Sequence, residues 1–270
     1  MRHERIQTIT LPSEDQRLAW ITGGGTGIGL ACARALGRAG WRLALSGRRP
    51  EVLAQAVSAL ATEHIAAQAY PLDVADGEAV IEVAQAIARA QGPIGALICS
   101  AGTNVPKRRW DELTPQAFAQ VTAINLSGVA YCVTAALPSM REARSGSIVV
   151  VSSWAGWRYL PLAAAAYGAS KYGLSPLVES INDQECRHGI RATLLCPGEV
   201  ATDILLTRPV APAPEEIARM LRADDVAQAA LYAIQAPRHV CLNEIVITPT
   251  WNRFYTGVAE ASQSRGPAQN

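Results

Sequence analysis

Residues 18–29 read LAWITGGGTGIG, and this stretch decides the fold. The apolar run Leu18–Thr22 is typical of a buried strand, and the glycines after it lead into a segment with helical spacing of apolar residues. Gly23 permits a tight turn, Gly27 lets a pyrophosphate approach the backbone, and Gly29 lets the helix pack on the strand. The N-terminus of that helix would face the anion. No Lys-Ser or Lys-Thr follows, which excludes a P-loop and leaves a dinucleotide site or a plain turn.

Short apolar runs alternate with longer helical patterns along the rest of the chain. Strands are expected at Leu18–Thr22, Arg42–Ser46, Ala67–Pro71, Ala96–Cys99, Ile148–Ser152, Ile190–Leu195 and Glu244–Ile247. Helices are expected at Ile28–Ala39, Glu51–Glu63, Gly77–Gln91, Pro115–Met140, Ala163–Cys186 and Asp225–Gln235. This alternation predicts an α/β fold in a single domain: a Rossmann-type doubly wound parallel sheet of about seven strands with helices on both faces.

The pattern also predicts where this domain begins and ends. Periodicity runs over residues 17–251, which form the expected dinucleotide-binding domain. Residues 200–222 are rich in proline and weakly periodic, so we expect them to form a lid over a substrate. Residues 1–16 are expected to be an N-terminal extension and residues 252–270 a flexible C-terminal tail, because neither segment has a regular apolar pattern.

Composition excludes several classes of protein. The chain has 24 Lys and Arg against 23 Asp and Glu, so no basic excess favours a nucleic-acid partner. Its 49% hydrophobic residues exclude a disordered chain. The N-terminus is too polar for a signal peptide, and the longest apolar stretch, Gly128–Leu137, is too short to span a bilayer, so we expect a cytoplasmic protein with no membrane partner. None of the six cysteines has zinc-site spacing, and no metal is expected.

Tyr167 and Lys171 lie four residues apart on an expected helix, so they share one face. A free tyrosine has a pKa of about 10 and is a poor proton shuttle at neutral pH, whereas a nearby ammonium lowers that pKa. Such pairs are also common on exposed helices. This pair, however, follows Ser152 and Ser153 at the end of an apolar strand, which makes it a candidate acid/base site.

These motifs, in this order, resemble the short-chain dehydrogenase/reductase family over roughly Ala19–Thr250. In that family a tyrosine is the acid/base on the substrate oxygen, and a lysine holds the nicotinamide ribose. A serine at the preceding strand end orients the substrate, and an asparagine in the long helix holds a water of the proton relay. The resemblance gives these catalytic roles to Tyr167, Lys171, Ser153 and Asn125. The gap between serine and tyrosine is slightly longer than usual, so Ser152 is a second candidate.

The resemblance also implies a cofactor site. Asp73-Val74 matches the pair that contacts adenine, and PGEVAT at 197–202 matches the PGxVxT motif that meets the carboxamide. Ser100-Ala101-Gly102 departs from the usual Asn-Ala-Gly, which puts one local contact in doubt. The implied cofactor residues are Gly23, Gly25, Thr26, Gly27, Ile28, Gly29, Arg48, Arg49, Asp73, Val74, Ser100, Ala101, Gly102, Tyr167, Lys171, Pro197, Gly198, Val200 and Thr202.

The end of the second strand favours NADP(H) over NAD(H). Enzymes that use NAD place a carboxylate there for the ribose 2′-hydroxyl, whereas those that use NADP remove it and supply arginine. Gly47 stands at the acidic position, and Arg48 and Arg49 follow it. Guanidinium groups suit phosphate geometry, although these two could be solvated loop charges. The family's other basic signal is missing, because Thr26 stands at that position.

The implied reaction is reversible hydride transfer between a nicotinamide and the carbonyl or alcohol carbon of a small substrate. The candidate pocket residues are Trp154, Trp157, Arg158, Tyr159 and Leu205. Arg158 could pair with a substrate carboxylate or remain an exposed loop arginine. Residues 240–250 resemble a subgroup that contains NADP-dependent 3-hydroxy acid dehydrogenases.

Two other functions remain open. A 3-oxoacyl-carrier-protein reductase would need a basic docking patch, which Lys107, Arg108 and Arg109 could supply. A noncatalytic NADP-sensing regulator would tend to lack the tyrosine or the lysine. The resemblance further implies a homodimer or homotetramer formed through the helices at Pro115–Met140 and Ala163–Cys186.

Overall fold

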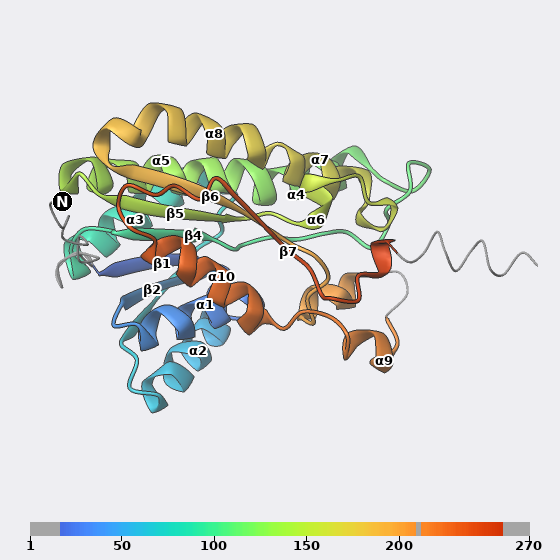
Figure 1. Ribbon diagram of the computed structural model, residues 1–270, viewed down its shortest axis with the longest axis horizontal. Coiled ribbons are helices and arrows are strands. Elements are labelled where there is room, and N and C mark those ends of the chain that lie inside the picture. The colour runs from blue at the N-terminus through green and yellow to red at the C-terminus, as the bar shows by residue number, and fades with distance from the viewer. Residues whose placement is uncertain (1–16, 209–211, 256–270) are drawn as a thin grey trace, which may run out of the picture.

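Seven parallel strands form one sheet in the order β3-β2-β1-β4-β5-β6-β7 (Figure 1). The computed structural model describes residues 17–208 and 212–255. The strands are β1 (Leu18–Thr22), β2 (Arg42–Gly47), β3 (Ala67–Pro71), β4 (Ala96–Cys99), β5 (Gly146–Val151), β6 (Ile190–Pro197) and β7 (Glu244–Ile247). The central strands are buried on both faces, which is why they read as unbroken apolar runs. The predicted fold class is confirmed.

Helices cover both faces of this sheet (Figure 1). One face carries α1 (Gly27–Arg38), α2 (Pro50–Thr62) and α10 (Ala223–Gln235) over one core cluster. The other carries α3 (Gly77–Gln91), α4 (Pro115–Thr122), α5 (Gly128–Ala143), α7 (Ala165–Tyr172) and α8 (Leu174–Glu185). A second core cluster lies beneath α3, α5 and α8. Along these helices the residues that face the core recur at helical spacing, as the sequence indicated.

Two predicted helices differ from the observed ones. The helix expected over Pro115–Met140 contains a π-helical turn, η2 (Ala123–Ser127), between α4 and α5. The helix expected over Ala163–Cys186 divides at Gly173 into α7 and α8 and is flanked by the 3-10 turns η3 (Pro161–Ala163) and η4 (Cys186–His188). Three short elements, α6 (Trp154–Trp157), η5 (Asp203–Thr207) and α9 (Pro214–Ile217), were not predicted. They are too short to show a helical period.

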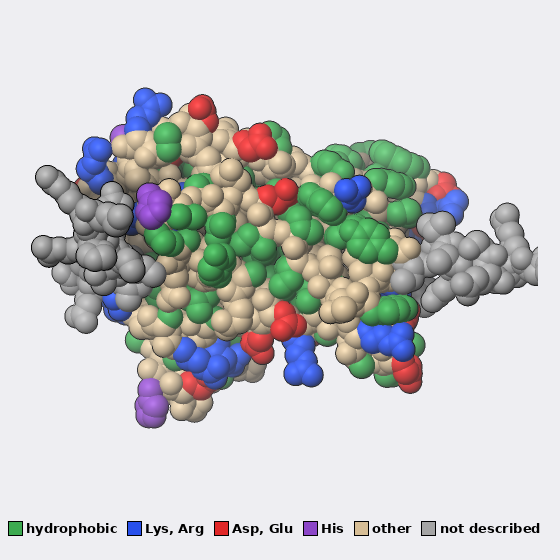
Figure 2. Space-filling model, viewed as in Figure 1, with side chains coloured by type: hydrophobic (Ala, Val, Ile, Leu, Met, Phe, Trp, Pro, Cys, Tyr) green, Lys and Arg blue, Asp and Glu red, His purple; other side chains and the backbone are tan. Residues whose placement is uncertain are grey.

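The long helix Pro115–Ala143 is long and apolar enough to cross a membrane by length and composition, contrary to the expectation that no segment is. Its apolar character has a local cause, because Cys132, Val133, Ala136 and Met140 pack in the core against the sheet. On the face drawn in Figure 2, basic and acidic side chains of the described residues are interspersed.

The order of the strands reverses between β1 and β4, where α/β sheets bind ligands at the carboxyl ends of their strands. The two strand ends are joined by Thr22, whose hydroxyl donates to the Ile98 carbonyl (3.4 Å) and accepts from the Ala101 N–H (3.3 Å). Gly23 lies against the backbone of Ser100 and Ala101 with φ +65°, which favours glycine. The glycine turn and the loop after β4 therefore form one packed edge.

Gly29 fixes how closely α1 approaches this edge. A methyl group there would lie 2.2 Å from the Gly23 carbonyl oxygen, so the backbone would have to move. We expect Gly29→Ala to lower the free energy of unfolding, measured by urea denaturation, by about 1–3 kcal/mol. Gly168→Ala is the control, because its added methyl meets no atom within 4 Å and should be neutral or stabilise α7 by up to about 1 kcal/mol. Equal stability of the two variants would contradict the role of Gly29.

Candidate active site

Tyr167, Ser153 and Lys171 meet beyond the carboxyl end of β5. Tyr167 and Lys171 lie on α7, and Ser153 is the N-cap of α6, where its hydroxyl accepts from the Ala155 N–H (3.2 Å). Ser153 acts on the Tyr167 hydroxyl and lowers its pKa. The Lys171 ammonium lies 5.8 Å from the centre of the Tyr167 ring. The structure therefore brings together three of the four candidate catalytic side chains.

The two adjacent serines have different partners. The Ser152 hydroxyl is buried and donates to the backbone carbonyl of Lys171 (3.1 Å), which ties β5 to α7. Ser153 is the serine that lowers the pKa of Tyr167. This difference favours Ser153 over Ser152 as the serine that would orient a substrate oxygen.

Burial governs the titration of both residues on α7. Desolvation raises the pKa of Tyr167 above its usual value, while Ser153, Arg108 and Arg208 lower it. Desolvation also lowers the pKa of Lys171 to about 8. The sequence predicted that Lys171 would lower the pKa of Tyr167. That effect stays a prediction, and in the structure the Lys171 ammonium donates to the Val151 carbonyl (2.8 Å).

Asn125 is fully buried in the π-helical turn η2 and faces the loop after β4. Its side-chain amide donates to the Thr103 carbonyl (2.9 Å) and the Ser170 hydroxyl (3.2 Å), and its oxygen accepts from the Thr103 N–H (2.8 Å). Asn125 thus joins the β4 loop to α7. Its predicted role in a water relay stays a prediction.

A strained residue sets the start of α7. Ala164 has φ +74° and ψ 154°, a conformation that costs a non-glycine residue about 1–3 kcal/mol. The loop before it is held from outside, since the Asn104 amide donates to the Ala163 carbonyl (2.9 Å). Arg108 donates to the Leu162 carbonyl (2.7 Å). These bonds fix the segment that places Tyr167.

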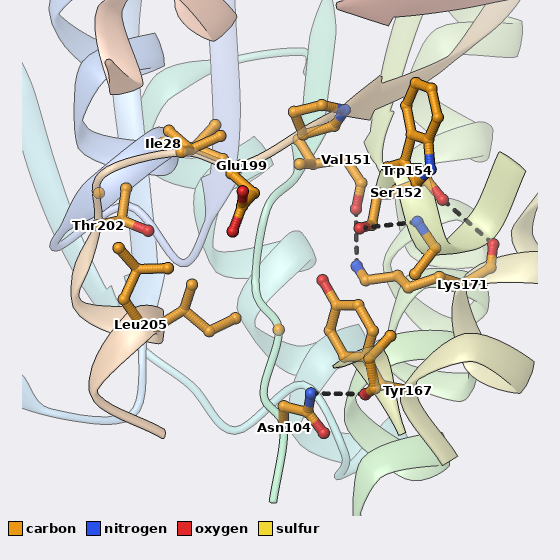
Figure 3. Close-up of a pocket in the computed structure, with 18 of the residues that line it drawn as sticks. Ile28, Asn104, Val151, Ser152, Trp154, Tyr167, Lys171, Glu199, Thr202 and Leu205 are labelled. Atoms are coloured by element: carbon orange, nitrogen blue, oxygen red, sulfur yellow. Dashed lines mark hydrogen bonds between the residues drawn. The ribbon is translucent and has the colours of Figure 1, made fainter. Parts of the chain in front are cut away.

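A cavity of about 370 Å³ opens in front of Tyr167, and Figure 3 shows Tyr167, Glu199, Thr202 and Leu205 facing it. Its walls include the catalytic candidates Ser153, Tyr167 and Lys171 and the predicted pocket residues Trp154 and Leu205. The predicted cofactor residues in its walls are Gly23, Thr26, Gly27, Ile28, Ser100, Ala101, Gly102, Pro197, Gly198, Val200 and Thr202. Residues from five distant segments therefore form one site.

A second cavity of about 150 Å³ lies on the other side of the glycine turn. It is lined by the predicted residues Gly25, Arg48, Arg49, Asp73 and Val74. Gly23, Thr26, Ala101 and Gly102 line both cavities, so the two form a continuous crevice across the switch point. Gly29 lies behind the turn, against its backbone. This two-part crevice flanks the N-terminus of α1, which is where Rossmann-type folds bind a dinucleotide.

Three predicted pocket residues lie outside the first cavity. Arg158 stacks on the Trp157 ring, with 4.3 Å from its guanidinium carbon to the ring centre. Tyr159 is 84% exposed. Trp157 packs instead against the core cluster beneath α8. The prediction that Trp157, Arg158 and Tyr159 line the pocket is corrected, because none of them lines the first cavity.

The family model for short chain dehydrogenase matches residues 17–209. The chain belongs to the short chain dehydrogenase family. It is 29% identical over 233 residues to an oxidoreductase of Staphylococcus aureus strain MW2, covering 86% of this chain and 97% of that one. It is also 29% identical over 258 residues to glycine betaine reductase ATRR of Emericella nidulans, which covers 92% of this chain but 20% of that protein. The chain thus spans a fifth of the fungal protein.

Two solved structures resemble this dehydrogenase closely. One is an alcohol dehydrogenase from Thermococcus sibiricus in complex with 5-hydroxy-NADP, with TM-score 0.79, 28% identity and coverage of 88% of this chain and 98% of that one. The other is an actinorhodin polyketide ketoreductase variant with NADPH, with TM-score 0.80, 26% identity and coverage of 88% and 98%. The protein is an oxidoreductase that acts on CH–OH or carbonyl groups.

Several charged residues of this dehydrogenase's site were not predicted. Glu199, the variable residue of the PGxVxT motif, is buried in the cavity wall, and Arg108 and Arg208 line the same cavity. The sequence did contain a sign of the role of Glu199, because a carboxylate directly after a buried strand must pair with a cation or a hydrogen-bond donor. Arg108 and Arg208 carried no such signal, because their positions depend on how distant loops fold.

The C-terminal segment also contributes to the site. Asn252 is buried, a helical turn begins at Arg253, and Phe254 lines the cavity. The rings of Phe254 and Tyr255 lie 5.8 and 5.3 Å from that of Trp154. The prediction of a flexible tail from residue 252 is wrong for residues 252–255. The rest of that tail and the N-terminal extension 1–16 lie outside the described residues. No group of His, Cys, Asp or Glu in the described ranges could hold a metal ion.

The buried ammonium of Lys171 gives a pH signature to stability. Its pKa of about 8 in the folded chain lies below its ordinary value of 10.5. Between these values the unfolded chain binds more protons, so the cost of burying Lys171 is full below about pH 8 and falls as pH rises. We therefore compare the free energy of unfolding of Lys171→Met with that of the natural chain. The advantage of the variant should fall by about 2 kcal/mol between about pH 7 and about pH 9.5. Urea denaturation at both pH values measures it.

Lys107→Met is the matched control, because Lys107 is the chain's other lysine and is exposed. Its difference from the natural chain should stay constant over the same range. A constant difference for Lys171→Met as well would show that Lys171 is not desolvated.

Proposed function

We propose that this dehydrogenase transfers hydride reversibly between NADP(H) and the carbonyl or alcohol carbon of a small substrate, with Tyr167 as the acid/base. The observation that carries the proposal is that Ser153, Tyr167 and Lys171 line one end of a crevice whose other end is lined by Arg48 and Arg49. A nicotinamide nucleotide supplies the hydride when bound.

The side chains divide the work of proton transfer and charge stabilisation. Burial keeps the Tyr167 hydroxyl protonated at neutral pH, as reduction of a carbonyl requires. Ser153 hydrogen-bonds to the reacting oxygen of the substrate and so orients that oxygen toward the Tyr167 hydroxyl. Lys171, Arg108 and Arg208 stabilise the phenolate that forms when Tyr167 gives up its proton. In the reverse direction the phenolate takes the proton from the alcohol.

The second cavity supports NADP(H) over NAD(H). Arg48 and Arg49 line it, and the backbone of Gly47 places no carboxylate there to repel a 2′-phosphate. Asp73, which also lines it, is engaged locally, since its carboxylate accepts from the Ala75 N–H (3.0 Å). The similar alcohol dehydrogenase and ketoreductase were solved with NADP-type nucleotides. Both observations favour the phosphorylated cofactor.

The alternatives from the sequence gain little support. A carrier-protein reductase would present Lys107, Arg108 and Arg109 as one patch, but Arg108 lies in the cavity wall, whereas Arg109 is exposed and pairs with Asp111. A noncatalytic regulator would not need Ser153, Tyr167 and Lys171 together in one cavity wall. The 3-hydroxy acid dehydrogenase subgroup stays a prediction.

We propose that the protein self-associates through α4, α5, α7 and α8, as a dimer or tetramer. Tyr131 on α5 and Tyr172 on α7 are large apolar side chains left 39% and 47% exposed, and such patches favour association. A cytoplasmic location stays a prediction.

Loss of the Tyr167 hydroxyl tests the chemistry. We expect Tyr167→Phe to lower kcat for NADPH-dependent carbonyl reduction by about 10²–10⁴-fold, because general acid catalysis contributes that much. NADPH affinity, followed by nucleotide fluorescence, should change little. Tyr172→Phe is the matched control on the same helix, since its hydroxyl donates to the Trp157 carbonyl away from the cavity. Full turnover by Tyr167→Phe with NADPH bound would refute the proposal.

The choice of nucleotide is tested at the end of β2. We expect Arg48→Ala to lower kcat/KM with NADPH about 10- to 100-fold, the value of a charge-assisted hydrogen bond, and to leave NADH little affected. Gly47→Asp should shift preference toward NADH, and an added Cβ there meets only Leu53 at an ordinary 3.6 Å. Arg38→Ala, an exposed arginine paired with Glu63, is the control. An unchanged NADPH/NADH ratio in both site variants would contradict the assignment.

A further inference from the structure

The C-terminal turn at residues 253–255 carries one aromatic ring into the wall of the cavity in front of Tyr167. The turn follows the buried Asn252, whose side-chain oxygen accepts from the Phe254 N–H (3.1 Å). Phe254 lines the cavity, whereas the next residue, Tyr255, does not line it and is 63% exposed. A segment that follows the last strand of the sheet therefore reaches the site where a substrate would lie.

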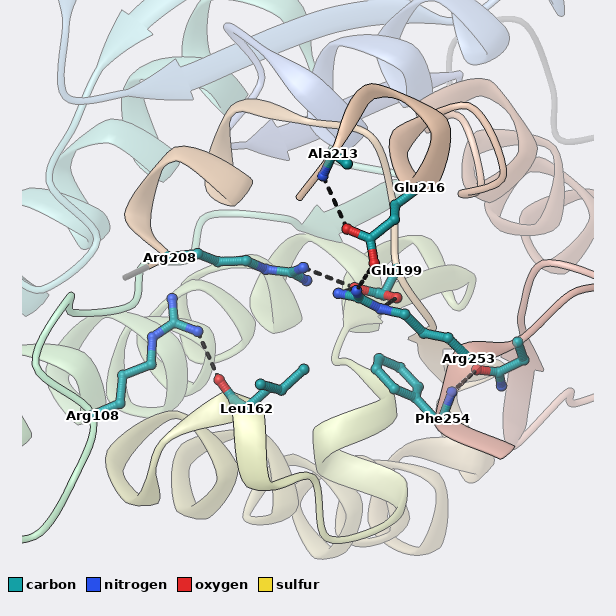
Figure 4. Close-up of polar contacts among 9 residues, drawn as sticks. Arg108, Leu162, Glu199, Arg208, Ala213, Glu216, Arg253 and Phe254 are labelled. Carbon is teal, nitrogen blue, oxygen red and sulfur yellow. Dashed lines mark hydrogen bonds and ion pairs between the residues drawn. The ribbon is translucent and has the colours of Figure 1, made fainter. Parts of the chain in front are cut away.

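Ion pairs anchor this turn to the rest of the site. Two nitrogens of Arg253 bind the two carboxylate oxygens of Glu199 at 2.5 and 2.6 Å, and a third binds Glu216 of α9 at 2.6 Å (Figure 4). The side chains of Arg253 and Glu199 are only 23% and 6% exposed, so salt screens this bidentate pair less than a surface pair. The residue directly before Phe254 is thus held to the PGEVAT motif.

A buried indole supports the Phe254 ring. The centres of the Trp154 and Phe254 rings lie 5.8 Å apart, and Trp154 is only 4% exposed. Because protein interiors are closely packed, Trp154 cannot move aside to let the Phe254 ring withdraw from the cavity. The ring therefore has a fixed place in the wall, set by an ion pair next to it in the chain and by an aromatic contact.

Apolar side chains from two other segments line the same cavity. Leu160 and Leu162 follow α6, and Leu205 lies in η5. Figure 4 shows the Leu162 and Phe254 side chains directed toward the same space. Small-molecule pockets combine such apolar walls with a few polar groups that fix the orientation of the ligand. These four side chains therefore suit a hydrocarbon group of the substrate.

Charged side chains in the wall already have partners within the protein. Arg208 contacts Glu199 at 2.8 Å. Arg108 and Lys171 donate to backbone carbonyls at 2.7–3.0 Å. A substrate therefore need not supply a counter-charge for any of these cations, and the apolar side chains decide which substituent fits.

We propose that Phe254 is a specificity-determining residue, and that the substrate is a small ketone or secondary alcohol with an apolar substituent that packs against this ring. The reacting oxygen meets Tyr167 and Ser153, and Arg253 is the positioning residue that holds Phe254. This inference rests on the proposed oxidoreductase function. In reduction, hydride from NADPH forms the new C–H bond, the carbonyl π pair takes the Tyr167 proton, and NADP⁺ is released. The substituent does not react.

Three substrates of one shape test the chemical character of the substituent. 5-Methyl-2-hexanone, 4-oxopentanoate and 4-oxopentanamide end in an apolar, an anionic and a neutral polar group. We expect kcat/KM for the hexanone to exceed that for each of the others about 10-fold or more, because their polar ends lose water against apolar side chains. Equal turnover of the three, or faster turnover of the acid or the amide, would overturn the inference and leave the oxidoreductase function intact.

A larger ketone tests the ring itself. We expect Phe254→Ala to raise kcat/KM for 4-phenyl-2-butanone, relative to that for 5-methyl-2-hexanone, about 10-fold or more. Tyr255→Ala is the matched control, because the Tyr255 ring also packs on Trp154, at 5.3 Å, but does not line the cavity. It should keep the natural ratio. An unchanged ratio in Phe254→Ala, or an equal change in both variants, would overturn the role of Phe254.

The positioning role of Arg253 has its own signature. We expect Arg253→Gln to shift the same ratio in the same direction through KM, while kcat for 2-propanone, which lacks the substituent, stays within about twofold. Arg253→Lys, which keeps the charge, should shift the ratio less. Arg38→Gln is the control, because it removes an arginine from an ion pair on α1. An equal loss of kcat on 2-propanone and on the larger ketones would show a general defect and overturn this role.

A binding measurement separates this inference from the proposed function. N-isobutylacetamide and N-acetylglycine have the shapes of the hexanone and the acid, but their amide carbonyl is not reduced by NADPH, so their effect on Tm reports binding alone. In the presence of NADP⁺ we expect N-isobutylacetamide to raise Tm, N-acetylglycine not to do so, and Phe254→Ala to reduce the shift. A shift without NADPH oxidation by any ketone would leave the apolar site standing and refute the function. No difference between the two ligands would refute the apolar site.

Discussion

A single buried ammonium connects most of the active site. Lys171 is almost fully enclosed, and a charge in that position is costly unless groups are arranged around it. Its donation to the Val151 carbonyl requires α7 to lie at the end of β5, and the Ser152 hydroxyl holds the backbone of the same residue. One turn earlier on that helix, Tyr167 is carried to Ser153. The position of the acid/base therefore follows from where the lysine must lie.

The sheet supplies the frame for this arrangement, and most of it could be predicted. Buried parallel strands must be apolar along their whole length, so β1 and β4 appear in the sequence with the bounds the structure gives them. The edge strands β3 and β7 are only partly buried, but their predicted bounds also agree. Helix interruptions were less predictable. The π-helical turn at Asn125 and the break at Gly173 keep the helical spacing of apolar residues, and their cause is tertiary: Asn125 must reach Thr103 and Ser170.

The site itself was predictable where it depends on a local motif. The glycine turn, the Tyr167–Lys171 spacing and PGEVAT each place backbone or side chains within one segment, and the structure places them along one crevice. The prediction of pocket residues failed where closeness to Ser153 in the sequence was taken to mean a place in the cavity wall. Arg158 follows Ser153 closely in the sequence, yet it stacks on Trp157 outside the cavity. Arg108, Arg208 and Phe254 do line the cavity, but they lie in segments whose positions no helical or strand periodicity predicts.

The same distinction explains the titration of Tyr167. Spacing along a helix shows that a lysine is near, but it does not show how much water either group loses. Burial raises the pKa of the phenol, and the cations that oppose this shift come from the β4 loop and the lid segment. The acidity of Tyr167 therefore depends on side chains from segments that are far apart in the sequence. Glu199, held by Arg208 and Arg253, joins the lid segment to the C-terminal turn through ion pairs.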